Sequence, residues 1–117
     1  MDLKKYQELC KKTAKQFDNK NEEIMCLGLG IAGEAGDVAG CIKKTMAHKD
    51  DQIQGTKENL GDTMWYLAMI ANFYGWDLQE VLNENIEKLT KRYNGGGFNE
   101  SDAAKRDRID WNEEGLK

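Results

Sequence analysis

Apolar residues recur every three or four positions along most of the chain, which is the spacing of one face of an α-helix. No stretch shows the alternation typical of a half-buried strand, and the sequence contains no proline. The pattern predicts helices over about residues 3–17, 21–47, 56–74 and 78–93, with one short turn after Ser101. The chain is therefore predicted to be all-α, an antiparallel bundle of about four helices.

Local signals mark two of the expected helix ends. Asn19, followed by Glu22, has the spacing of a capping box and predicts the start of the second helix. Gly75 follows the third helix, where a glycine commonly ends a helix in the left-handed conformation. The polar segment of residues 48–55 is expected to form the loop between the second and third helices.

The length of 117 residues allows one domain and no second core. We expect a single domain over residues 1–117, with its core at about 21–94 and a charged tail at about 99–117. The third helix is apolar on nearly every side, and such a helix needs cover all round. We therefore expect the bundle to be completed by oligomerisation, as a homodimer or a homotetramer.

Charge and cysteine content narrow the function classes. A net charge of −4 and a pI near 5.1 argue against a general nucleic-acid binder, because such proteins carry basic excess to meet phosphates. With three scattered cysteines and one histidine, neither a zinc site nor a disulfide framework is expected. Because no disulfide framework is expected, the protein is expected in the reducing cytoplasm. We also expect neither a leader peptide nor a membrane span.

Two groups of acidic and amide side chains stand on neighbouring predicted helices. Glu34 and Asp37 are three residues apart on the second helix, so they share one face. On the third helix, Glu58 and Asn59 precede Asp62 by four and three residues. Each group lies about 8 to 10 residues from the connecting loop, roughly 12 to 15 Å along its helix. An antiparallel hairpin would therefore bring both groups to the same height.

Converging carboxylates repel one another, and a hard divalent cation relieves that repulsion. The oxygen donors predict a Mg²⁺ site, with Mn²⁺ as the possible substitute. Glu58 has a simpler interpretation as a surface acid near a helix N-terminus. Asp62 is the only charge between Leu60 and Trp76, and we expect it to be buried.

Three segments carry a resemblance to a known family: LGLGIAGEAGDVAGCIKK, KENLGDTMWYLAMIA and NIEKLTKRYNGGGF. Together they resemble the MazG-like all-α nucleoside triphosphate pyrophosphohydrolases over roughly residues 25–98. The family pattern is a pair of acids on one helix and E-x-x-D on the next. Glu34 and Asp37 match the first pair, and Asp62 matches the final aspartate. Asn59 stands where the family has its glutamate, so either Asn59 or the adjacent Glu58 would complete the metal site.

The resemblance implies Mg²⁺-dependent hydrolysis of a nucleoside or deoxynucleoside triphosphate to the monophosphate and pyrophosphate. A metal-activated water would attack the α-phosphorus, with Glu34 and Glu58 as candidates for the carboxylate that assists it. The candidate substrate contacts on the later helices are Tyr66, Asn85, Lys88 and Arg92. Core packing is the simpler role for the neighbouring Trp65.

Three alternatives remain open at the level of sequence. A non-catalytic helical interaction module that retains the fold is favoured by Asn59. A relative of the same enzyme class would act on dUTP, dCTP or phosphoribosyl-ATP instead. A helix-turn-helix DNA-binding protein is disfavoured by the acidic charge and by the lack of a basic recognition helix.

Overall fold

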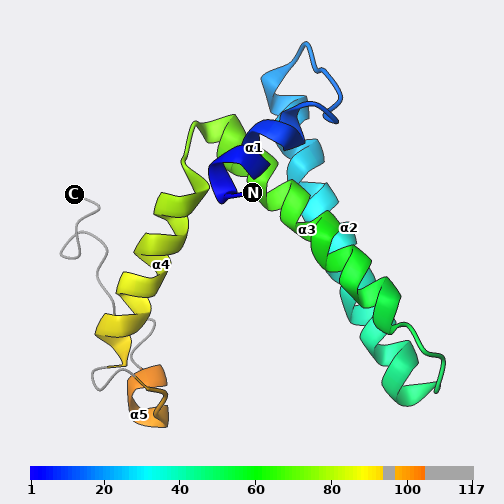
Figure 1. Ribbon diagram of the computed structural model, residues 1–117, viewed down its shortest axis with the longest axis vertical. Helices are drawn as coiled ribbons and strands as arrows, with labels where there is room; N and C mark the ends of the chain where they lie inside the picture. The colour runs from blue at the N-terminus through cyan, green and yellow to red at the C-terminus, as the bar shows by residue number, and fades with distance from the viewer. Residues whose placement is uncertain (94–96, 105–117) are drawn as a thin grey trace. The chain divides into compact units, whose positions relative to one another are not determined.

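The computed structural model describes residues 1–93 and 97–104, and every regular element in this part is a helix (Figure 1). In chain order the helices are α1 (Leu3–Lys11), α2 (Lys20–Ala47), α3 (Ile53–Tyr74), α4 (Leu78–Arg92) and α5 (Glu100–Ala103). The all-α fold class is thereby confirmed. Contacts divide the chain into two units, Met1–Leu78 and Gln79–Lys117, and each is described by itself. Most of the predicted charged tail, residues 105–117, lies outside the described part.

The centre of the first unit is an antiparallel hairpin of α2 and α3, which run side by side in Figure 1. Near the loop, the hydroxyl oxygen of Thr45 accepts a hydrogen bond of 2.9 Å from the backbone N–H of Gln52. Further from the loop, near the middle of both helices, the Tyr66 ring packs directly against the backbone of Gly30. These pairings fix the register of the hairpin, and they confirm that the two acidic groups lie at matching heights.

The signals that were expected to end helices do so in the structure. The side chain of Asn19 accepts a hydrogen bond of 3.1 Å from the backbone N–H of Glu22, at the N-cap of α2. Gly75 has a φ of 74°, and its N–H donates to the carbonyls of Ala71 and Asn72. A residue with a side chain would be strained in this left-handed conformation, so glycine is well suited to end α3 here.

Two predicted boundaries are wrong. The first helix ends at Lys11 rather than near residue 17, and the chain then turns at Thr13. Its hydroxyl donates to the carbonyl oxygen of Cys10 at 3.2 Å and accepts from the Trp65 indole N–H at 2.8 Å. At the other end of the chain, α5 is capped by Asn99 and not by Ser101, since the Asn99 side chain accepts from the backbone N–H of Asp102.

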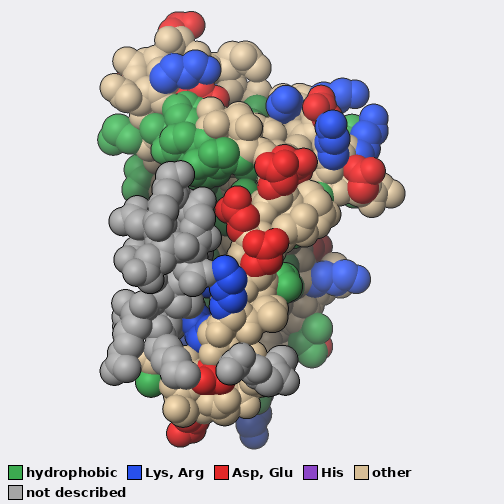
Figure 2. All heavy atoms as spheres, turned by 90° about the vertical axis from the view of Figure 1, so that its left-hand side faces the viewer, with side chains coloured by type: hydrophobic (Ala, Val, Ile, Leu, Met, Phe, Trp, Pro, Cys, Tyr) green, Lys and Arg blue, Asp and Glu red, His purple; other side chains and the backbone are tan. Residues whose placement is uncertain are grey.

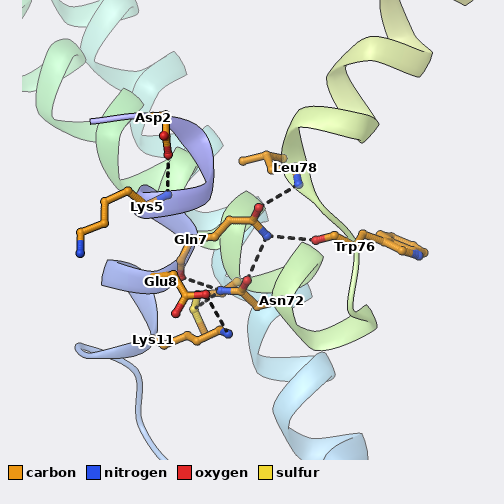
Figure 3. Close-up of polar contacts among 9 residues, drawn as sticks. Asp2, Lys5, Gln7, Glu8, Lys11, Asn72, Trp76 and Leu78 are labelled. Atoms are coloured by element: carbon orange, nitrogen blue, oxygen red, sulfur yellow. Dashed lines mark hydrogen bonds and ion pairs between the residues drawn. The ribbon is translucent and has the colours of Figure 1, made fainter.

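A buried glutamine holds α1 against the end of α3 (Figure 3). The Gln7 side chain is 7% exposed and donates to the Asn72 side-chain oxygen and to the Trp76 carbonyl, both at 3.0 Å. Its oxygen accepts a hydrogen bond of 2.8 Å from the backbone N–H of Leu78, the first residue of α4. Asn72 returns a bond from its amide to the Gln7 carbonyl at 3.0 Å. Gln7 therefore provides an acceptor for the N–H of Leu78, which, as the first residue of α4, has no carbonyl partner within that helix.

The helix α2 is long and apolar enough to cross a membrane when judged by length and composition alone. Core helices of soluble proteins and leader segments meet the same criterion, so the observation has little weight by itself. The absence of a membrane span stays a prediction. Hydrophobic side chains do reach the surface in the described part of the chain, and Figure 2 shows several of them gathered in one patch.

Candidate functional site

The hairpin positions the first acidic pair and Asp62 on adjoining faces. Glu34 is half-buried on α2, whereas Asp37 and Asp62 are exposed. The expectation that Asp62 is buried is therefore wrong. Its apolar neighbours misled the prediction because they project from other sides of the helix, and Leu60 itself is 57% exposed.

The three acids are nonetheless close enough to interact electrostatically. The pKa of Glu34 is raised above its ordinary value, first by partial burial and then by the negative charges of Asp62 and Asp37. One of these charges comes from the same helix and the other from across the hairpin. The fold thus concentrates negative charge around Glu34, as the matching heights of the two groups predicted.

Glu58 and Asn59 lie one turn before Asp62 and differ in their surroundings. Glu58 is exposed, and it is not one of the two charges acting on Glu34. Asn59 is half-buried, and its side-chain amide donates to the Cys41 sulfur at 3.5 Å. The amide of Asn59 is thereby turned toward α2.

The oxygen donors around Glu34 suit a hard divalent cation, which would relieve the repulsion by Asp62 and Asp37 that adds to the effect of burial on the Glu34 pKa. Within residues 1–93 and 97–104, however, no three His, Cys, Asp or Glu side chains are already arranged to hold a metal ion. The donor chemistry and the charge therefore fit Mg²⁺, although the described side chains do not yet converge on one position that a single ion could occupy.

Next to the acids, the aromatic residues of α3 line a pocket. Tyr66 follows Asp62 by one turn and lies against Gly30, where a Cβ atom would overlap its ring. Tyr66 and Trp65 meet edge to face, with ring centroids 5.0 Å apart. Together with residues of α2 and of the segment after α1, they line a pocket of about 200 Å³: Ala14, Lys15, Phe17, Glu23, Cys26, Leu27, Trp65, Tyr66 and Met69. The sequence analysis did not identify Phe17 as a residue that borders a pocket.

A second residue that the sequence analysis missed is Tyr6 on α1. Burial, a hydrogen bond with Cys10 and the charges of Cys10 and Asp62 raise its pKa to about 12. The phenol thus lies within electrostatic reach of Asp62 and remains neutral at ordinary pH. Its place on an apolar stripe gave no signal of this, because tyrosine is common on such stripes.

The remaining candidates lie on α4 in the second unit. Asn85 is exposed, while Lys88 and Arg92 are half-buried. The Arg92 Nε is buried and has no hydrogen-bond partner among the described residues. The roles of these three residues in substrate binding stay predictions.

Comparisons with known proteins agree with the motifs. Residues 22–96 match the MazG nucleotide pyrophosphohydrolase domain family. The gene 37 protein of Mycobacterium phage L5 is 38% identical over 82 residues, which cover 64% of this chain and 70% of the phage protein. The uncharacterized protein YvdC of Bacillus subtilis (strain 168) is 31% identical over 70 residues, which cover 51% of this chain and 66% of YvdC.

No solved structure gives a significant match to this chain. The family assignment therefore depends on the sequence match, which spans α2, α3 and α4 and includes every acid of the hairpin. The matched segment is well over half of the 117 residues. This chain belongs to the MazG nucleotide pyrophosphohydrolase domain family.

Proposed function

We propose that this protein hydrolyses a nucleoside or deoxynucleoside triphosphate to the monophosphate and pyrophosphate in a Mg²⁺-dependent reaction, with Mn²⁺ as a substitute. The observation that carries the proposal is the electrostatic interaction of Glu34 with Asp62 across the hairpin and with Asp37 on the same helix. The family is one of nucleotide pyrophosphohydrolases, and this cluster lies inside the matched segment.

Glu34, Asp37 and Asp62 would hold the cation, and Glu58 or Asn59 would complete its ligands. When bound, the cation neutralises phosphate charge and lowers the pKa of a water molecule. In the proposed reaction a water molecule would attack the α-phosphorus, and the bond from this phosphorus to the oxygen bridging to the β-phosphate would break. Glu34 or Glu58 accepts the proton of the water, and pyrophosphate leaves with the electron pair.

The aromatic pocket would receive the base of the nucleotide. Tyr66 joins the pocket to the acids because it lies one turn from Asp62 on the same helix. Aromatic rings stack on any nucleobase, so the lining favours a base without choosing between purine and pyrimidine. Asn85, Lys88 and Arg92 are proposed to contact the substrate. The positive side chains of Lys88 and Arg92 would bind its phosphates.

Pyrophosphate release from a panel of ribo- and deoxynucleoside triphosphates with Mg²⁺ tests the proposal. Asp62→Asn keeps the shape of the side chain, removes its charge and is expected to abolish release. Asp18→Asn is the matched control, since Asp18 is an exposed acid outside the site. The panel should include dUTP, dCTP and phosphoribosyl-ATP to separate the narrower substrates. Absence of release with every nucleotide would overturn the proposal.

A second function, a non-catalytic interaction module, is favoured by one observation. Asn59 replaces the family's glutamate, and its amide is engaged by Cys41. A module of this kind would bind nucleotide or Mg²⁺ without turnover. Two measurements together distinguish the functions. A module would bind Mg²⁺ or a non-hydrolysable triphosphate in isothermal titration without releasing pyrophosphate from any nucleotide, whereas the enzyme would do both.

A further inference from the structure

The pocket beside Tyr66 has a lining that is mostly aromatic and apolar, with few groups able to hydrogen-bond the edge of a base. Within this lining Glu23 is the acidic residue and Lys15 the basic one. An apolar pocket takes its specificity from the small number of polar groups that meet the ligand. The preference of this pocket among bases therefore depends on what its polar side chains donate and accept.

Glu23 has one carboxylate oxygen left for a ligand. Its side chain is 21% exposed, and Oε1 accepts a hydrogen bond of 3.4 Å from the ammonium of Lys20, whose side chain is 81% exposed. Among the described residues, the second oxygen, Oε2, has no hydrogen-bond partner. Glu22 and Glu23 both lie in the first turn of α2, where acids favour the helix N-terminus. That role explains both acids equally, but Glu23 also lines the pocket and Glu22 does not.

The hydrogen-bond donors of the pocket are engaged or exposed. The Trp65 indole N–H is already used, because it donates to the Thr13 hydroxyl oxygen at 2.8 Å. Lys15 is exposed, and its ammonium lies over the Phe17 ring, 5.1 Å from the centroid. The half-buried Glu23 carboxylate is therefore the charged group best placed to discriminate between bases.

The Glu23 carboxylate only accepts hydrogen bonds, whereas the Tyr66 hydroxyl donates or accepts and so fits any base. Cytosine, adenine and guanine carry an exocyclic amino group, and acidic side chains accept from the amino group of cytosine. Uracil and thymine have a carbonyl oxygen at that position, which repels a carboxylate. We infer that Glu23 favours substrates whose base carries an exocyclic amino group over those with uracil or thymine. The inference rests on the proposed function, which places the base in this pocket.

The nucleotides dCTP and dUTP form a matched pair for this inference. They share the sugar and the phosphates, and their bases differ at the amino or carbonyl group and at the proton of the adjacent ring nitrogen. Hydrogen bonds to a charged group are stronger than those between neutral groups, and uracil would leave the carboxylate facing a carbonyl oxygen. Because Glu23 keeps some contact with water, we expect a preference of about tenfold rather than the much larger ratios of a closed site.

Isothermal titration of the full chain with Mg²⁺ and the α,β-imido analogues of dCTP and dUTP tests the inference without turnover. The wild type is expected to bind the dCTP analogue about tenfold more tightly. Glu23→Gln replaces the carboxylate with an amide that both donates and accepts, so the ratio is expected to fall to about twofold or less. Glu22→Gln makes the same change at the adjacent exposed acid and should keep the wild-type ratio.

The same comparison with the analogues of dATP and dITP extends the test to purines, since hypoxanthine has a carbonyl oxygen where adenine has its amino group. Circular dichroism checks that both variants keep their helices, and the wild-type ratio tests the inference even if Glu23→Gln does not fold. Equal affinities in the wild type, tighter binding of the dUTP analogue, no binding of either analogue, or a preference that survives Glu23→Gln would overturn the inference.

Pyrophosphate release from dCTP and dUTP, measured separately, distinguishes this inference from the proposed reaction. An amino preference in binding without any release supports the role of Glu23 and contradicts the reaction. Release from both nucleotides with equal binding of their analogues supports the reaction and contradicts the role of Glu23.

Discussion

Burial raises the pKa of Glu34 on α2, and the charge of Asp62 raises it further, although Asp62 belongs to a different helix, α3. The contact exists before any cation binds, so the hairpin alone is sufficient to bring these charges together. An unneutralised carboxylate cluster is a poor arrangement for stability and a suitable one for binding a divalent ion.

Replacing Asp62 with Asn is expected to lower the pKa of Glu34 toward its ordinary value in the metal-free protein, because one of the two repelling charges is removed. Carboxyl-carbon NMR titration of labelled glutamate measures this directly. Asp18→Asn should leave the Glu34 titration unchanged. An unchanged Glu34 pKa in the Asp62 variant would mean that the two side chains do not interact in solution.

The raised pKa of Glu34 also predicts how Mg²⁺ binding depends on pH. Because the folded pKa lies above the unfolded one, the ionised carboxylate costs the folded state free energy, and this cost is lost as pH falls through the raised pKa. The cation competes with the proton for the same oxygens. Mg²⁺ affinity, measured by calorimetry, should therefore rise with pH across that window. Affinity that is flat across the titration of Glu34 would contradict its role as a ligand.

Asn59→Glu restores the acidic residue of the family pattern and is expected to tighten Mg²⁺ binding by about tenfold, roughly 1.4 kcal/mol. The new carboxylate would add a charged oxygen on the side of α3 that faces α2. Asn21→Glu adds the same charge at an exposed position and serves as the control. Unchanged or weaker binding by Asn59→Glu would favour Glu58 as the completing ligand.

Gly30→Ala is expected to destabilise the protein by about 1 to 3 kcal/mol, because the added methyl group overlaps the Tyr66 ring. Gly40 is a helical glycine with open space at its Cβ position, so Gly40→Ala should be neutral or stabilising by up to about 1 kcal/mol. Urea unfolding measures both. A double-mutant cycle with Tyr66→Ala should recover most of the Gly30→Ala loss, and additive effects would contradict the contact.

Gln7→Leu removes the bonds to Asn72, Trp76 and Leu78 and leaves their polar groups without a partner. Loss of roughly 3 kcal/mol of unfolding free energy is expected, since each orphaned buried group costs about 1 to 3 kcal/mol. Gln16→Leu makes the same change at an exposed position and should have little effect. Equal stability of the two variants would show that water replaces the lost bonds.

Much of the fold could be predicted because its determinants are local. Helical periodicity located α2, α3 and α4 to within a few residues, and Asn19 and Gly75 marked ends that depend on their own side chain or conformation. The end of α1 could not be predicted in this way. It depends on the indole of Trp65, which is far from Thr13 in sequence and holds its hydroxyl.

The same contrast between local determinants and contacts distant in sequence applies to the candidate site. Spacing on each helix, combined with hairpin length, was enough to bring Glu34, Asp37 and Asp62 together. The burial of Asp62 was predicted wrongly because apolar neighbours in sequence need not be neighbours on one face. Gln7 and Tyr6 were missed since each interacts only with residues brought near by the packing of α1 on α3.

The bonds of Gln7 have a consequence for where this domain can be cut. The family match begins at residue 22, after α1, yet Asn72, Trp76 and Leu78 inside the matched segment all bond to a side chain before it. A fragment trimmed to the matched residues would leave these groups without the partner that Gln7 provides. The folding unit is therefore larger than the segment that the family shares. A truncated or transplanted domain must keep α1 to remain folded.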